Sequence, residues 1–220
     1  LKTLTVASNL TAGFDSIEVR NKVLGAVTSH DKISAFKGGI NFDEKDDMGR
    51  SMLAMEMRAG FPDFLGSMSK HDANASRAPS DASSEFQRYN LTFNRTTYLP
   101  FNSLFLNTFR YQFTTDPLLT PEQMVLGGAD SVRGFPENEY LADQAWIVNI
   151  ELRSPAFLIP SFFKVPFDKK GTRLIDAIQF AYFIDAGEGR LNNARVGEKE
   201  RKRLTSAGFG LRFDLYEHLR

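Results

Sequence analysis

The sequence contains no cysteine in 220 residues, which excludes a disulfide scaffold, a thiolate zinc site and a thiol nucleophile. Neither sign of charge dominates, because 27 Lys and Arg balance 27 Asp and Glu, and this argues against a nucleic acid as partner. No run approaches the roughly 18 to 20 apolar residues that a membrane-spanning helix requires. A transmembrane β-barrel is not excluded, because strands that alternate apolar and polar residues have a mean hydropathy near zero, and the mean hydropathy here is −0.30.

Local motifs of catalysis and nucleotide binding are also missing. The sequence has no GxxxxGK[ST] loop, no GxGxxG turn and no GxSxG elbow. Its three histidines, His30, His71 and His218, are far apart and none belongs to an HExxH pattern. The acidic run at 44–47 is interpreted as a solvated turn. We therefore expect no catalytic residue, no metal site, no cofactor and no nucleotide, and the protein is predicted not to be an enzyme.

Aromatic and β-branched residues are abundant, with 20 Phe among them, and several segments alternate with the period of a β-strand. In the clearest segment, apolar side chains from Trp146 to Leu152 take one face and Ile147, Asn149 and Glu151 the other. The pattern predicts an all-β, antiparallel fold of about eight strands. The predicted strands lie near 3–14, 32–44, 51–61, 87–99, 103–114, 146–153, 178–185 and 206–215.

Three connections between these strands are long. The segment 66–85 is small, polar and breaker-rich, and it is predicted to be a mobile loop rather than a domain linker. The segment 188–203 is charged and is predicted to be solvated. The segment 115–144 carries glycines, prolines and apolar residues, and loops of this length are generally functional or disordered. Nothing in this organisation requires a second domain.

The third connection contains the stretch VLGGADSVRGF at 125–135, and a later strand contains FIDAG at 183–187. Arg133 lies in a glycine-bordered turn, and alternation places Asp185 on the polar side of its strand. A guanidinium that met this carboxylate would fasten the loop to the sheet. The alternative is an ordinary turn with an exposed Arg, whose ion pairs contribute only about 0 to 1 kcal/mol. Spacing alone favours this alternative.

The two motifs carry a family resemblance. The first resembles the VRGF signature of the POTRA-plus-barrel outer-membrane superfamily, and FIDAG is similar to its partner motif F-x-D-x-G, in the same order along the chain. The flanking stretches 110–123 and 142–155 resemble the two-partner secretion translocators, which are the haemolysin secretion/activation proteins. This resemblance covers roughly residues 87–216.

The resemblance implies a transmembrane β-barrel of sixteen strands, with a long loop that inserts into the lumen. Residues 1–220 would then form a partial outer-membrane barrel domain of about eight strands without a POTRA domain. It also implies that the arginine of the loop motif binds the aspartate of the barrel-wall motif. The implied lumen-loop residues are Val132, Arg133, Gly134 and Phe135, and the implied wall residues are Phe183, Asp185 and Gly187.

By the same resemblance, the protein is expected in the bacterial outer membrane, where it would export an unfolded partner of the haemolysin or adhesin type. Its expected partners are this secreted protein and outer-membrane lipid, with no nucleic acid and no nucleotide. One alternative is a barrel-assembly insertase of the same superfamily. Another is a soluble β-sheet module that binds a ligand with loop 115–144, since alternating aromatics fill the core of a sandwich equally well.

Overall fold

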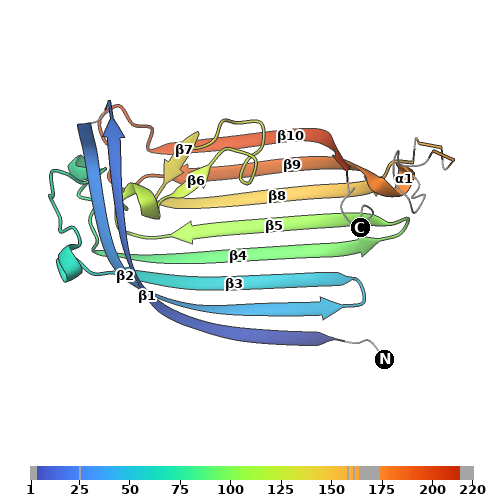
Figure 1. Ribbon diagram of the computed structural model, residues 1–220, viewed down its shortest axis with the longest axis horizontal. Helices are drawn as coiled ribbons and strands as arrows, with labels where there is room; N and C mark the ends of the chain where they lie inside the picture. The colour runs from blue at the N-terminus through green and yellow to red at the C-terminus, as the bar shows by residue number, and fades with distance from the viewer. Residues whose placement is uncertain (1–3, 25, 158, 161, 164–173, 214–220) are drawn as a thin grey trace.

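A computed structural model describes residues 4–24, 26–157, 159–160, 162–163 and 174–213. It contains one eight-stranded antiparallel sheet in the order β1-β2-β3-β4-β5-β8-β9-β10 (Figure 1). The strands are β1 (Thr5–Val23), β2 (Ala26–Asp46), β3 (Gly49–Gly60), β4 (Phe86–Leu99), β5 (Ser103–Phe113), β8 (Gln144–Pro155), β9 (Ile178–Arg190) and β10 (Arg201–Phe213). Two short strands, β6 (Met124–Leu126) and β7 (Tyr140–Ala142), pair with each other inside the connection between β5 and β8.

The prediction of an all-β, antiparallel fold with about eight strands is confirmed. The first two strands are longer than their predicted ranges, and they bend away from the rest of the sheet in Figure 1. The remaining elements are short: η1 (Phe64–Gly66), η2 (Ala78–Ser80), η3 (Thr120–Glu122) and α1 (Leu174–Ala177). The predicted strand end at 214–215 lies outside the described residues. No helix in the described part of the chain is long and apolar enough to cross a membrane.

One face of the sheet is a continuous apolar surface. Strand registry places large side chains of neighbouring strands beside one another on this face, and many of them are exposed, Phe209 by as much as 81%. Exposed members include Phe14, Phe36, Met55, Met57, Tyr89, Tyr111, Phe113, Leu152, Tyr182, Ile184, Phe209, Leu211 and Phe213. A soluble sandwich would bury such a face against a second sheet. The described residues form no such second layer over this face, and an outward apolar band is typical of a barrel in lipid.

The opposite face is polar and is covered in part by the connections. Registry aligns Asn149 of β8 with Asp185 of β9, and Asp185 with Ser206 of β10. Thr108 of β5 lies beside Asn149 in the same way. This alternation is the one that the sequence predicts for β8, β9 and β10, and it gives the sheet one apolar and one polar face.

The sheet is open, because β1 and β10 are its two edge strands and do not pair with each other among the described residues. At one end lie three long connections, 61–85, 114–143 and 191–200, and the short turn between β1 and β2. At the other end lie the turns 47–48 and 100–102 and the connection from β8 to β9. Outer-membrane barrels have longer loops on the extracellular side than on the periplasmic side. We call the end with the three long connections the mouth; it is at the left in Figure 1.

The connection 61–85 is packed rather than mobile, and that prediction is wrong. Met68, Ala75 and Ala82 are buried together with Ile33 of β2 and with Leu118 of the next mouth connection. Ser80, Ser83 and Ser84 are buried as well. Small residues gave the segment the appearance of a loop, but small side chains also let a chain lie close against a sheet and against another loop.

Candidate functional site

The connection 114–143 runs back over the polar face of β8 and β9 (Figure 1). Its two consecutive glycines have positive φ angles of 96° at Gly127 and 98° at Gly128. A Cβ atom at Gly127 would lie 2.5 Å from the Pro136 carbonyl oxygen, and one at Gly128 would lie 2.0 Å from the Glu137 carboxylate. Only glycine fits both the conformation and the space. The Gly128 amide donates to the Phe135 carbonyl at 3.2 Å, which closes residues 128–135 into a compact tip.

Arg133 at this tip is held by Asp185 of β9 through three hydrogen bonds. Its Nε donates to Oδ2 at 2.7 Å, its Nη2 to Oδ1 at 2.8 Å, and its backbone amide to Oδ2 at 3.0 Å. Its Nη1 donates to Glu151 of β8. The guanidinium carbon also lies 3.8 Å from the centre of the Phe183 ring, within the range of a cation–π interaction. We call this set, Arg133 with Glu151, Phe183 and Asp185, the tip clasp.

The tip clasp is more buried than a surface ion pair. Asp185 is fully buried, whereas the Arg133 side chain is 21% exposed. Hydrogen bonding to Asp185 and to Glu151 raises the pKa of the Arg133 guanidinium, so it stays charged at every physiological pH. The alternative of an ordinary turn with an exposed arginine is therefore wrong for this structure. The forked, two-point geometry fixes the position of the loop tip as well as its charge.

The other residues of the two motifs shape this junction. A Cβ atom at Gly187 would lie 3.1 Å from Cγ2 of Val132, so the glycine of the wall motif leaves room for the valine of the loop motif. Val132 is fully buried, and Phe135 packs against the same apolar cluster. Gly134 has a φ of 85°, a conformation that favours glycine. The structure thus brings together all seven residues that the resemblance implies, while their role in function stays a prediction.

Three further residues of the site were not predicted. Glu151 binds Arg133, and Asn149 donates from Nδ2 to the Ser131 carbonyl at 2.5 Å. Arg110 of β5 donates to the Asp130 carbonyl. All three lie on the polar face in registry with the residues around Asp185, so alternation along β5 and β8 would have pointed to them.

A second acidic contact holds the first part of the loop. Glu122 is buried, with its Oε1 3.1 Å from Nε of Arg58 on β3 and its Oε2 2.8 Å from Nη1 of Arg88 on β4. The charges are reversed relative to the tip clasp, because here the loop supplies the acid and the sheet supplies the bases. The loop is therefore tied to β3 and β4 at its start and to β8 and β9 at its tip.

The arrangement positions the loop tip on the sheet. A polar cavity of about 360 Å³ lies between the tip and the sheet, and it is lined by residues that include Arg110, Arg133, Arg153, Asn149 and Glu151. In the described part of the chain, no three His, Asp or Glu side chains gather as metal ligands would. Among the side chains around the cavity, Arg133, Glu151 and Arg153 are paired ions that hold the loop tip in place.

Two comparisons relate this geometry to known proteins. Residues 7–213 match the family model described as haemolysin secretion/activation protein ShlB/FhaC/HecB. Among solved structures, the chain is similar to CdiB from Escherichia coli, with a TM-score of 0.67, 20% sequence identity and coverage of 94% of this chain. It spans 35%, about a third, of the CdiB chain. No curated protein matches the chain.

The structural likeness shows the fold, an antiparallel sheet that follows part of a β-barrel wall. The family match extends from β1 to the end of β10 and therefore includes both motifs of the tip clasp. The sequence resemblance stated above is confirmed by this match. The chain belongs to the haemolysin secretion/activation protein family.

Proposed function

We propose that the protein containing this chain is a translocator of the bacterial outer membrane, which exports an unfolded partner protein of the haemolysin or adhesin type through the lumen of a β-barrel. Membership of the family supports the transport role, and the exposed apolar face supports contact with outer-membrane lipid. No catalytic residue, cofactor, nucleotide or nucleic acid has a part in this proposal.

The observation that carries the proposal is the contact between Arg133 and Asp185. It holds the tip of loop 114–143 on the polar face of the sheet, which is the face that lines the lumen in a barrel. A loop held there occupies space that a translocating chain needs. We propose that the tip clasp opens during export and that the loop tip then leaves the wall, so that the closed and open states differ by a set of ionic contacts.

A reversible disulfide tests this proposal. A Cβ atom built on Gly134 lies 3.8 Å from Cβ of Ser206 on β10, which is the mean separation in disulfides. The two substitutions Gly134→Cys and Ser206→Cys, placed in the full-length protein, would lock the tip to the wall when oxidised. The 220 residues contain no other cysteine that would compete for pairing.

Export is measured as the amount of the neighbouring gene's secreted product in the culture medium. We expect the oxidised double variant to stop export and a reducing agent to restore it. Gly134→Cys alone is the control for the strain of a side chain at a positive φ, and Ser206→Cys alone is the second control. Normal export by the fully oxidised double variant would contradict the proposal, because the tip would then not need to move. Assembly of other outer-membrane barrels, measured in the same cells, should be unchanged; a defect there would favour the insertase alternative.

A further inference from the structure

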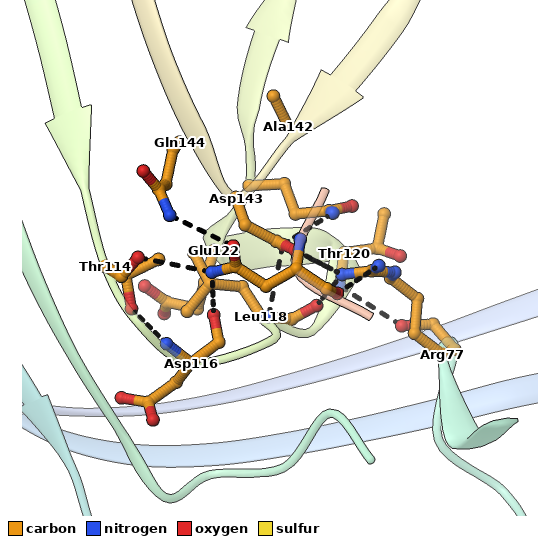
Figure 2. Close-up of polar contacts among 12 residues, drawn as sticks. Arg77, Thr114, Asp116, Leu118, Thr120, Glu122, Ala142, Asp143 and Gln144 are labelled. Carbon is orange, nitrogen blue, oxygen red and sulfur yellow. Dashed lines mark hydrogen bonds and ion pairs between the residues drawn. The ribbon is translucent and has the colours of Figure 1, made fainter. Parts of the chain in front are cut away.

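A further buried ionic contact lies at the mouth, where the sequence has no recognised motif. Asp143 immediately precedes β8, and its side chain is fully buried. Arg77, from the connection 61–85, donates from Nη1 to both of its carboxylate oxygens at 2.8 and 3.1 Å. Figure 2 shows Arg77 reaching Asp143 from a separate segment of the chain. The Arg77 side chain is only 6% exposed, so both partners are removed from water.

The Asp143 carboxylate also accepts hydrogen bonds from three other groups. These are the backbone amide of Leu118 at 3.1 Å, Nε2 of Gln123 at 2.8 Å and the backbone amide of Asn192 at 2.7 Å. Such a number of donors offsets the cost of burying the charge, which a single cation seldom does. The carboxylate is therefore the centre of a fully satisfied polar network.

This network joins all three mouth connections. Arg77 comes from 61–85, and Leu118 and Gln123 from 114–143. Asn192 comes from 191–200, and its side-chain Nδ2 donates to the carbonyls of Thr114 at 3.2 Å and Asp116 at 3.0 Å. Figure 2 shows Thr114, Asp116, Leu118 and Asp143 gathered around these bonds. The prediction that 188–203 is solvated is wrong at this point, since Asn192 and the buried Leu191 are part of the packed mouth.

The mouth network and the tip clasp share no residue. The network holds the two ends of loop 114–143, near Leu118 and at Asp143, whereas the tip clasp holds its middle at Arg133. We propose that Asp143 and Arg77 are positioning residues of a second, independent clasp, which keeps the base of the loop and the mouth connections together while the tip is released. The consequence for export rests on the proposed function, but the existence of the second clasp does not.

A buried serine provides the probe. Ser80 of η2 is 1% exposed and its hydroxyl has no hydrogen-bond partner among the described residues, so Ser80→Cys is a small change that breaks no hydrogen bond seen there. In the full-length protein in intact cells, we expect a membrane-impermeant maleimide to label this cysteine slowly. Arg77→Met or Asp143→Asn should raise the labelling rate about tenfold or more, because the connection 61–85 then opens locally. Val196→Cys, on a fully exposed side chain, gives the rate for free access.

A matched control comes from the same connection. Lys70 forms an exposed ion pair with Glu85, and Lys70→Met should leave the labelling of Ser80→Cys unchanged. Arg77→Lys keeps the charge but loses the forked geometry, so its labelling rate should fall between those of the parent and Arg77→Met. The heat-modifiable band of the folded barrel on a gel shows that each variant has assembled.

Independence of the two clasps is measured with the cysteine pair at positions 134 and 206. We expect this disulfide to form at the parent rate in Arg77→Met, because the tip clasp is intact. Unchanged labelling of Ser80→Cys in an assembled Arg77→Met variant would overturn the proposal, and so would a disulfide yield that falls together with the loss of protection. Faster labelling of an assembled variant with unchanged export would show that the second clasp protects the connection 61–85 but that export does not depend on it.

Discussion

The tip clasp and the mouth clasp, as we call the second clasp formed by Arg77 and Asp143, are both arginine–aspartate contacts of one loop, but their surroundings differ. Asp185 and Asp143 are both fully buried, but the Arg133 side chain is 21% exposed and the Arg77 side chain only 6%. At the tip, Asp185 accepts one backbone amide bond, from Arg133 itself, whereas at the mouth Asp143 accepts two, from Leu118 and Asn192. A contact beside a polar cavity, made chiefly by side chains, can exchange its partners for water. A contact built into the backbone of three connections cannot exchange without opening them.

This difference gives the loop a fixed base and a releasable tip. Loops that move in function are generally held by fewer buried contacts than the elements that carry them. The apolar cluster around Val132 and Ala142 connects the two clasps, and it includes Leu126 of β6 and Ile147 of β8. We therefore expect motion to begin at the tip and to end where this cluster meets the mouth clasp.

The largest expected effect comes from breaking the mouth clasp on its acidic side. Asp143→Ala leaves Arg77 buried without its carboxylate and removes the acceptor of the Leu118 and Asn192 amides. Removing one partner of a buried pair costs about 3 to 5 kcal/mol, and we expect a loss of this size in the unfolding free energy of the refolded barrel. Urea unfolding, followed by the heat-modifiable band, measures it. A loss below about 1 kcal/mol would show that water replaces the carboxylate, and the comparison with the tip would then fail.

The tip clasp should be weaker by the same measurement. Arg133→Ala removes the partner of Asp185, but the site borders a polar cavity that admits water. We expect a cost between the values for surface and buried pairs, about 1 to 3 kcal/mol. Arg133→Lys keeps the charge but not the two-point fork, so it should retain only part of the stability that Arg133→Ala loses. An Arg133→Ala cost equal to that of Asp143→Ala would contradict the ranking of the two clasps.

The sequence predicts the tip better than the mouth, for physical reasons. The strands and their faces follow from alternation in segments such as 146–153 and 206–213, where each side chain meets the environment of its own face. The motifs predict Arg133 and Asp185, because both lie in short, recognisable patterns. The strands β6 and β7 have three residues each, which is too few for any period to be visible.

Arg77 and Asp143 are 66 positions apart, and neither lies in a pattern that alternation or spacing detects. Arg77 stands in a segment of small polar residues whose composition is the same in a solvated loop and in a packed one. Its burial depends on contacts with Leu118 and Asn192, which come from two other connections. Burial of this kind is a property of the assembled mouth and not of the local sequence.

A smaller loss of unfolding free energy is expected at Gly187, where the two motifs are in van der Waals contact. Gly187→Ala places a Cβ atom 3.1 Å from Val132, 3.2 Å from the Trp146 carbonyl oxygen and 3.3 Å from Ile147. Overpacking of this kind typically costs about 1 to 3 kcal/mol, and partial relaxation of Val132 should keep the cost near the lower value. The double variant Gly187→Ala, Val132→Ala should recover most of it in a double-mutant cycle of unfolding free energies. If the costs of the two substitutions were additive, the added methyl group would be opposed by Trp146 and Ile147 of the sheet and not by Val132 of the loop.

The smallest expected effect lies between the clasps, at Tyr140 of β7. Its hydroxyl shares its one proton between the carbonyls of Lys199 at 2.7 Å and Glu200 at 3.0 Å, and Tyr140→Phe should cost about 0.5 to 1.5 kcal/mol. Burial raises the pKa of Tyr140 to about 12, from about 10 in an unfolded chain. Because the folded state keeps the proton longer, the hydroxyl contributes fully below pH 10 and its contribution is lost as the pH rises toward 12. The difference in unfolding free energy between parent and Tyr140→Phe should therefore be constant from pH 7 to about pH 9 and shrink above pH 10. A difference that stays constant through pH 12 would show that the hydroxyl has the same pKa in the folded and unfolded states, so that it is solvated and β7 is not held to the connection 191–200.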